Sequence, residues 1–191
     1  MRKLVYFVGL SVDGYIAGPN GEIDFYPVAD DMWEWMRAEY PETLPTHVRP
    51  HVGLDVEAPN QKFDTLVMGR GTYDPALSIG VTSPYAHMKQ YVVSSTLGRI
   101  DDPGVELVER DPVGLVRELK RQDGMDIWLA GGGKFAAALL EEIDELVIKS
   151  YPVVAGTGVP GFAGEFRPTL FRPTERTGFS NGVQVTWLTR A

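Results

Sequence analysis

The 191-residue sequence contains no cysteine and only three histidines. The absence of cysteine excludes disulfide bonds and thiolate metal sites, and it fits a cytoplasmic protein. His47, His51 and His87 are scattered, and Pro45 and Pro50 interrupt the segment in which two of them could share a helix face. We therefore expect no metal site.

Long apolar runs and an excess of basic residues are also missing. No apolar stretch approaches the ~20 residues that span a membrane, and the apolar residues 3–11 are predicted to be a first strand, not a signal peptide. The formal net charge is −8, whereas a non-specific nucleic-acid binder needs a basic surface. We expect no membrane and no nucleic-acid partner. A few local cations and backbone amides can still bind an anionic cofactor.

A strand, a run of three glycines and an amphipathic helix are predicted in succession within residues 126–142. Residues 127–130 form a short apolar run, typical of a strand that is buried on both faces. Residues 131–133 are glycines, and apolar residues at helical spacing follow them. Such a turn presents free backbone N–H groups at the start of a helix, which suits a phosphate. The alternative is a tight strand-to-helix turn that binds nothing.

Other strands and helices are predicted on both sides of this stretch. Strands are expected at residues 3–11, 63–68, 90–93 and 145–151, and helices at residues 30–40 and 112–122. Residues 177–180 and 183–189 flank Asn181-Gly182, the commonest two-residue hairpin turn. The pattern predicts an α/β fold: a single three-layer domain over residues 1–191, with a mixed, mostly parallel sheet and an antiparallel C-terminal hairpin.

Three segments are predicted to lack regular structure. Residues 12–21 and 152–176 are rich in glycine, proline and other turn-forming residues. Residues 41–62 contain four prolines and show little periodicity. We expect this last segment to be a surface excursion that could close over a site as a lid.

Groups suited to phosphate follow three of the predicted strands. They are Gly69, Arg70 and Thr72 after the second strand, Ser94, Ser95 and Thr96 after the third, and Gly131, Gly132, Gly133 and Lys134 after the central strand. The carboxyl ends of parallel strands meet at one edge of a sheet, where ligands bind. Each group alone is weak evidence, because serine and threonine runs often only cap turns. Together they predict a dinucleotide site.

Residues 131–136 formally match the Rossmann G-x-G-x-x-A pattern, but their context differs. The Rossmann fingerprint opens its nucleotide-binding unit and is followed by an acidic residue ~20 positions later, at the end of the next strand. Here the next predicted strand ends before Pro152 without an acidic residue. A P-loop is excluded as well, because Phe135 follows Lys134 where serine or threonine is required.

Five short motifs occur in a recognisable order along nearly the whole chain. They are SVDGYIA at residues 11–17, MGRGTY at 68–73, VVSST at 92–96, GGG at 131–133 and PVVAGTG at 152–158. This order resembles the dihydrofolate reductase fold family, and within it the reductase domain of bacterial riboflavin biosynthesis and its small stand-alone relatives. The resemblance implies a dihydrofolate reductase-like fold and a reductase that uses NADPH.

The resemblance also implies which residues hold NADPH. By this resemblance, the adenosine-side phosphates contact Arg70 and Thr72, next to Gly69, and the 2′-phosphate and adenine contact Ser94, Ser95 and Thr96. The pyrophosphate contacts Gly132, Gly133, Lys134 and Phe135, next to Gly131. The nicotinamide contacts Gly9, Ile16 and Ala17. The residue chemistry agrees, because a guanidinium can bind a phosphate in a bidentate manner.

Three aspartates are candidates for supporting hydride transfer, which needs a proton donor or an oriented water near the reduced atom. By the same resemblance, Asp31, beside Asp30, falls near the acidic residue with which dihydrofolate reductases hold the pterin, although it could be only a helix N-cap. Asp24, before Phe25, matches an acidic-aromatic pair of the stand-alone relatives. Asp13 matches the aspartate of the riboflavin-type loop, although a turn-forming role is the alternative.

These observations favour an NADPH-dependent oxidoreductase that transfers a hydride to a pterin, a pyrimidine or a similar small heterocycle or carbonyl. Two alternatives stay open: a nucleotide-binding protein without catalysis, and the reductase of riboflavin biosynthesis itself, although no deaminase-like metal-binding domain is attached. We also expect a homodimer, as is common among family members of the riboflavin type. An independent reason is that the C-terminal hairpin would leave Phe179 and Leu188 facing outward.

Overall fold

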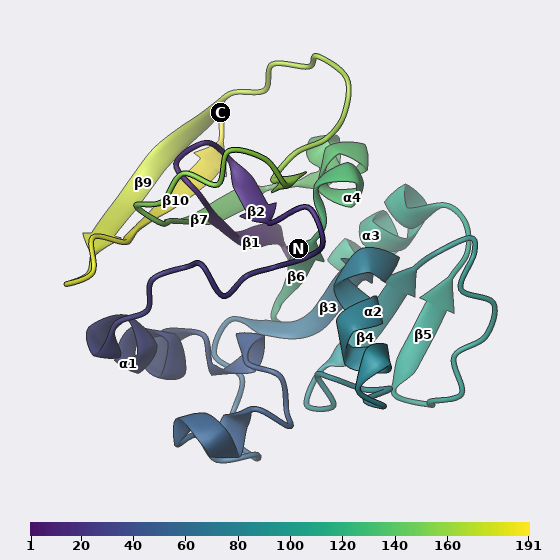
Figure 1. Ribbon diagram of the computed structural model, residues 1–191. Coiled ribbons are helices and arrows are strands. Elements are labelled where there is room, and N and C mark those ends of the chain that lie inside the picture. The colour runs from purple at the N-terminus through teal and green to yellow at the C-terminus, as the bar shows by residue number, and fades with distance from the viewer.

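The computed structural model describes residues 1–191 and contains an eight-stranded sheet, a two-stranded sheet and helices on both faces of the larger sheet (Figure 1). The strands are β1 Leu4–Leu10, β2 Tyr15–Ala17, β3 Phe63–Gly69, β4 Lys89–Val93, β5 Val105–Val108, β6 Asp126–Gly131, β7 Glu145–Ser150, β8 Val159–Pro160, β9 Phe171–Gly178 and β10 Gln184–Arg190. The α-helices are α1 Asp30–Glu39, α2 Arg70–Ser78, α3 Pro112–Arg121 and α4 Gly133–Ala138. Three 3₁₀ helices are η1 Pro41–Thr43, η2 Arg49–Val52 and η3 Leu140–Glu142.

The large sheet has the strand order β5-β4-β3-β6-β1-β7-β10-β9. Its first six strands are parallel, β10 runs antiparallel to β7, and β9 runs antiparallel to β10. The predicted α/β fold, with a mostly parallel sheet and an antiparallel C-terminal hairpin, is therefore confirmed. The central strand β6 lies between β3 and β1, which explains its continuous apolar run.

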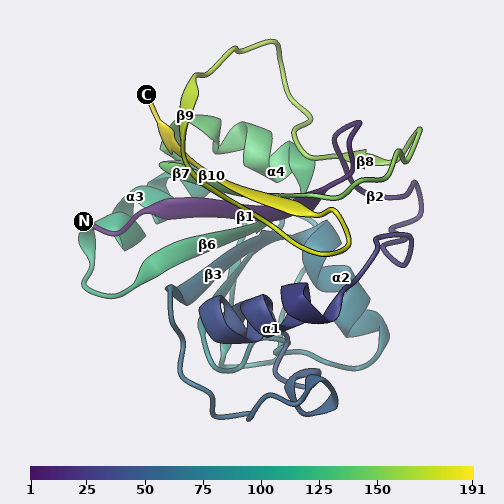
Figure 2. The same ribbon diagram turned by 90° about the vertical axis from the view of Figure 1, so that its left-hand side faces the viewer.

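Helices cover both faces of the sheet and make three layers (Figure 2). One core lies under α1, α2 and residues 41–62, and it includes Phe7 and Trp128. The other core lies under α3 and α4, and it includes Tyr6 and Leu129. Neighbouring residues of one strand, such as Tyr6 and Phe7, thus enter opposite cores, because successive side chains of a strand point to opposite faces.

Several strands lie in segments that were predicted to be irregular. β2 and β8 pair with each other inside the two turn-rich segments, and β5 was not predicted at all. β9 begins at Phe171, although a strand was expected only from residue 177. β2 and β8 are too short to show an alternating pattern, and β9 is mostly exposed and contains Pro173, so its sequence lacks apolar alternation.

Residues 41–62 run along the surface, as predicted, and two buried charged side chains anchor them to the core. The buried Glu42 carboxylate accepts hydrogen bonds from the backbone N–H groups of Gln61, Lys62 and Phe63, at 3.2, 2.7 and 2.8 Å. The guanidinium of Arg49 is buried and donates to four backbone carbonyl oxygens. The four prolines and the weak periodicity of this segment gave no sign of the two interior charges that hold it in place.

The C-terminal hairpin turns through three residues, not the predicted two. The N–H of Phe179 donates to the carbonyl of Val183 at 3.0 Å, and Gly182 has a φ of +84°, the combination typical of a type I turn with a following glycine. The prediction that Phe179 and Leu188 face outward is wrong, because both pack against core clusters. The exposed edge strand β9 carries the protecting residues Arg172, Pro173, Glu175 and Arg176. The homodimer stays a prediction, without the support of outward-facing Phe179 and Leu188.

None of the helices combines the length and the apolar character needed to cross a lipid bilayer.

Candidate functional site

The phosphate-suited groups predicted after β3, β4 and β6 lie together at the carboxyl edge of the sheet. The Arg70 guanidinium donates to the Thr96 hydroxyl at 3.0 Å, which joins the ends of β3 and β4. A β-carbon built on Gly69 would lie 3.5 Å from Cβ of Phe135, and one built on Gly131 would lie 3.8 Å from Oγ1 of Thr72. These short distances show that the ends of β3 and β6 lie side by side. A guanidinium, hydroxyls and backbone amides therefore lie together at this edge.

The three glycines of the central turn have different physical roles. Gly131 has a φ of +112°, which side-chain-bearing residues rarely adopt. A β-carbon on Gly132 would meet only Cδ1 of Ile16, at 3.7 Å, so the space above this residue is open. A β-carbon on Gly133 would lie 2.0 Å from the carbonyl oxygen of Pro160, so this glycine allows β8 to pack on the turn. Gly132 is thus the one whose missing side chain leaves room for a ligand.

The three hydroxyl groups of the turn after β4 differ in exposure: that of Ser94 is buried, and those of Ser95 and Thr96 are accessible. Ser94 is buried, and its Oγ accepts hydrogen bonds from two backbone N–H groups of the turn, at 3.2 and 3.1 Å. Ser95 and Thr96 are exposed. Arg70 is exposed as well, and its guanidinium pairs with Asp74 at 3.2 Å. Ser94 therefore shapes the turn, while its neighbours and Arg70 can contact a ligand.

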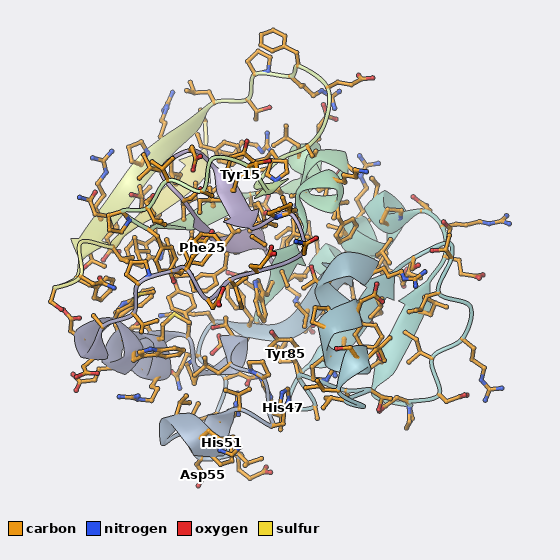
Figure 3. The ribbon with its side chains drawn as sticks, viewed as in Figure 1. Tyr15, Phe25, His47, His51, Asp55 and Tyr85 are labelled. Carbon is orange, nitrogen blue, oxygen red and sulfur yellow. The ribbon has the colours of Figure 1, made fainter.

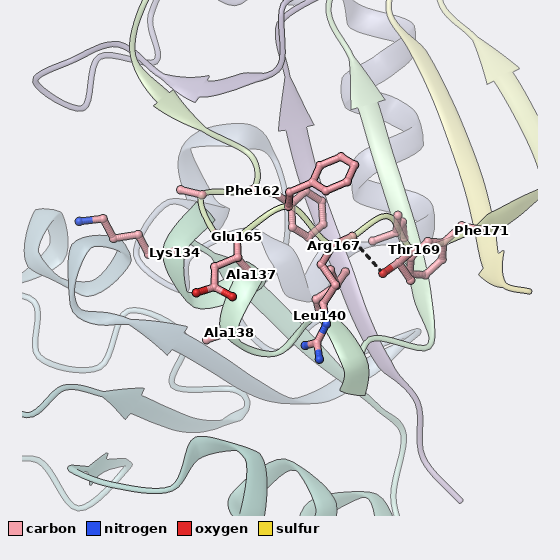
Figure 4. A pocket seen from close by; sticks show the side chains of 13 residues that line it. Lys134, Ala137, Ala138, Leu140, Phe162, Glu165, Arg167, Thr169 and Phe171 are labelled. Atoms are coloured by element: carbon pink, nitrogen blue, oxygen red, sulfur yellow. Dashed lines mark hydrogen bonds between the residues drawn. The ribbon is translucent and has the colours of Figure 1, made fainter.

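Lys134 lies in the first turn of α4 and is exposed. It lines a cavity of about 700 Å³ between α4 and residues 162–171 (Figure 4). The cavity is also lined by Ala137, Leu140, Phe162, Arg167 and Phe171, among others. None of the glycines 131–133 and none of the groups after β3 and β4 line it. Lys134 is therefore the only predicted cofactor residue that lines this cavity.

Asp13 holds two loops together at the end of β1. Its carboxylate accepts hydrogen bonds from Ser11 Oγ at 2.6 Å, from Ala155 N at 3.0 Å and from Gly156 N at 2.7 Å. These bonds, that of Ser11 first, lower the pKa of Asp13 to about 2. A carboxylate that stays ionised at neutral pH is suited to position the β2–β8 region and is a poor proton donor. Ile16 and Ala17 lie in this region, on β2.

Asp31 and Asp24 differ in how their carboxylates are engaged. The N-cap of α1 is Ala29, so the alternative role of Asp31 as an N-cap is wrong. Asp31 instead accepts hydrogen bonds from the N–H and hydroxyl of Ser180, at 2.8 and 2.9 Å, which ties α1 to the hairpin and lowers the pKa of Asp31. Asp24 is exposed and makes no hydrogen bond with its carboxylate. Of the three predicted aspartates, only Asp24 keeps its carboxylate free.

Lys149, on β7, was not predicted as a site residue. Its ammonium lies 4.4 Å from the centre of the Phe7 ring and has no hydrogen-bond acceptor or ion-pair partner in the protein. Burial lowers the pKa of Lys149 to about 8. Gly9, expected to line the nicotinamide, lies beside it, because a β-carbon on Gly9 would be 3.8 Å from Cε of Lys149 and 2.9 Å from Cε2 of Tyr151. A lysine within the strand predicted at residues 145–151 was the available signal.

The Lys149→Met variant is expected to be more stable than the wild type at pH 7, by about 2 kcal/mol after allowance for partial exposure. The unfolded chain has the ordinary lysine pKa of 10.5, and the folded chain has a pKa of about 8. Between these values the unfolded state binds more protons, so wild-type stability rises with pH. The difference in unfolding free energy between the variant and the wild type should be largest below pH 8 and should vanish near pH 10.5. Urea unfolding at several pH values measures this difference. A difference that does not change with pH would contradict the prediction.

The sequence profile of the RibD C-terminal domain matches residues 2–185. The chain is 26% identical over 186 residues to "Uncharacterized protein YwjB" of Bacillus subtilis (strain 168), with 96% of each chain covered. It is 25% identical to "Uncharacterized protein YyaP" of the same organism, over 95% of this chain and 92% of that one.

Solved structures share the fold. A "Putative riboflavin biosynthesis protein" from Shewanella sp. PV-4 superposes with a TM-score of 0.70 at 26% identity, covering 100% of this chain and 99% of that one. RibD of Acinetobacter baumannii superposes with a TM-score of 0.64 at 16% identity, and this chain spans 58% of its length. The predicted dihydrofolate reductase-like fold is confirmed. RibD C-terminal domains are reductase domains of riboflavin biosynthesis and are in general NADPH-dependent. The chain belongs to the RibD C-terminal domain family.

Proposed function

We propose that this protein is an NADPH-dependent reductase that transfers a hydride to a small heterocycle or carbonyl compound. The observation that carries the proposal is the open space above Gly132, at the edge where the groups after β3, β4 and β6 meet. An extended anionic ligand lying over the central turn would meet amides, hydroxyls and a guanidinium along its length. These are the donors that phosphates prefer.

The residues present fit NADPH in three parts. Free N–H groups at the start of α4 and the open face of Gly132 would hold the pyrophosphate. Arg70, Ser95 and Thr96, all exposed, would hold the phosphates on the adenosine side. The bound cofactor supplies the hydride, and the protein contributes by orienting it against the substrate. Ile16, which lies over the turn, would contact the nicotinamide side.

The proposal is tested by following the loss of NADPH absorbance with a panel of pterins, pyrimidines, quinones and small carbonyls. Turnover with at least one member, absent from the Gly132→Val variant, supports a reductase. NADPH binding without turnover of any member would support the alternative of a non-catalytic nucleotide-binding protein. Turnover confined to a ribosylated aminopyrimidine would support the alternative of a riboflavin-pathway reductase.

The Arg70→Ala variant is expected to bind NADPH more weakly by about 1.5–3 kcal/mol, the range for a hydrogen bond to a charged group. The affinity for NADH, which lacks the 2′-phosphate, should fall by less. Calorimetric titration of both cofactors measures the difference. Arg99→Ala is a matched control, because this exposed arginine lies in the loop after β4, near Thr96 in the sequence, and pairs only with its neighbour Asp101. An equal loss for NADPH and NADH would place Arg70 away from the 2′-phosphate.

A further inference from the structure

Lys149 differs from every other interior cation of the chain. Arg2 pairs with Asp64, Arg49 donates to four carbonyl oxygens, and the ammonium of Lys120 donates to the Glu142 carbonyl at 2.6 Å and pairs with Asp144 at 2.7 Å. Lys149 has no acceptor, only the ring of Phe7 beneath it. A cation that is partly removed from water without an acceptor destabilises the fold. The presence of this partly buried ammonium without an acceptor in the protein is explained if a ligand supplies the acceptor.

The ammonium of Lys149 is open to a ligand. Every completely enclosed side-chain nitrogen and oxygen of the protein has a hydrogen-bond partner. Since the Nζ of Lys149 has none, this atom is not completely enclosed and keeps contact with the outside. No carboxylate lies close enough to perturb its pKa, which burial alone lowers. Neither Asp13 nor Asp31 is therefore its hidden partner.

A second unpartnered donor lies on the same face of the chain. Tyr151 is two residues after Lys149, is only 8% exposed, and its hydroxyl makes no hydrogen bond. Its ring fills the place beside Gly9 and packs against the Tyr26 ring, with the ring centres 4.3 Å apart and the planes tilted by 36°. Tyr26 in turn packs against Phe25, which Figure 3 shows on the loop between β2 and α1. An ammonium and a hydroxyl thus lie beside a group of aromatic rings, which suits a planar ligand with an acidic oxygen.

We propose that Lys149 and Tyr151 bind an anionic oxygen, a carboxylate or an ionised ring oxygen, on the planar compound that the enzyme reduces. This inference rests on the proposed function for the identity of the site, and it restricts the substrate class. A cationic or strongly basic ring would be repelled by Lys149. An acidic heterocycle or an oxo acid would supply the acceptor that the ammonium lacks.

Matched pairs of planar compounds test the proposal, with binding measured by calorimetry at pH 7, with and without NADPH. The probes are orotate against uracil and pterin-6-carboxylate against pterin, which share a ring and differ in one carboxylate. In the wild type, at least one anionic member should bind about tenfold or more tightly than its neutral partner. In Lys149→Met, and in Lys149→Gln as a second variant, the ratio of the affinity for the anionic compound to that for its neutral partner should fall to about one. NADPH affinity should stay within about twofold of the wild type. Tyr151→Phe should lower the ratio by a smaller factor.

Lys62→Met is the matched control, since it removes one positive charge from an exposed lysine that pairs with Glu39 on the same side of the sheet. It should keep the wild-type ratio. A ratio near one in the wild type, no binding of either anion, or an unchanged ratio in Lys149→Met would each overturn the proposal. Failure of NADPH to bind would contradict the reductase function alone, because the preference for anions is also measured without the cofactor.

Discussion

The Gly132→Val variant is expected to fold normally and to lose about 100-fold or more in NADPH affinity, which corresponds to about 2.7 kcal/mol. Gly132 has φ −91° and ψ −168°, an extended conformation that side-chain-bearing residues adopt. The nearest atom to a β-carbon built on Gly132 would be Cδ1 of Ile16, at an ordinary contact distance of 3.7 Å. The valine methyl groups would fill the space that we assign to the pyrophosphate.

Calorimetry with NADPH measures the affinity, and circular dichroism verifies the fold. Gly132→Ala provides a graded comparison, with a smaller loss expected. Gly133→Ala is the contrasting control, because its β-carbon would lie 2.0 Å from the Pro160 carbonyl oxygen and should destabilise the protein itself. A folded Gly132→Val variant with wild-type affinity would show that the pyrophosphate does not lie on this turn.

The Arg49→Met variant is expected to be destabilised by about 3 kcal/mol or more. The guanidinium is fully buried and donates to Leu44 O at 3.4 Å, Val56 O at 2.8 Å, Ala58 O at 3.2 Å and Pro41 O at 3.1 Å. Methionine fills a similar volume but leaves these carbonyl oxygens without donors, each at a cost of about 1–3 kcal/mol. Relief of the buried charge offsets part of this loss.

Thermal unfolding measures the effect as a fall in melting temperature of about 6–12 °C for a chain of this size. Arg37→Met is the matched control, because Arg37 reaches the same segment through a single hydrogen bond to Val52 O, at 3.2 Å. It should cost less than about 1.5 kcal/mol. Equal destabilisation by the two variants would refute the role of Arg49 as the central support of residues 41–62.

The parts of the site that the sequence predicted depend on local signals and on one topological rule. The apolar run before Gly131 and the glycine turn after it lie next to each other in the chain, so a short window contains the whole strand–turn–helix unit. The approach of Arg70 to Thr96 follows from parallel strands whose carboxyl ends share an edge. The distinction between Gly132 and Gly133 could not be predicted, because it depends on β8, which lies almost 30 residues later.

Residues whose roles depend on burial of a charge could not be predicted from composition or periodicity. Arg49 and Lys149 are ordinary surface residues by hydropathy. Arg49 is buried only because residues 41–58 fold around it, and Lys149 lies over the Phe7 ring only because β7 packs beside β1. Asp13 was predicted as a catalytic candidate or a turn residue, and its hydrogen bonds to residues 155 and 156 favour a structural role. Residues 171–176 of the exposed strand β9 were missed for the opposite reason, since an edge strand without apolar alternation resembles a loop.

Calorimetric titration of the wild-type protein with NADPH and with NADH shows whether the carboxyl edge around Gly132 is an NADPH site. We expect saturable binding of one NADPH per chain, with NADH weaker by about tenfold or more, because Arg70, Ser95 and Thr96 would contact the 2′-phosphate. Absence of binding for both cofactors, or equal affinity for the two, would contradict it.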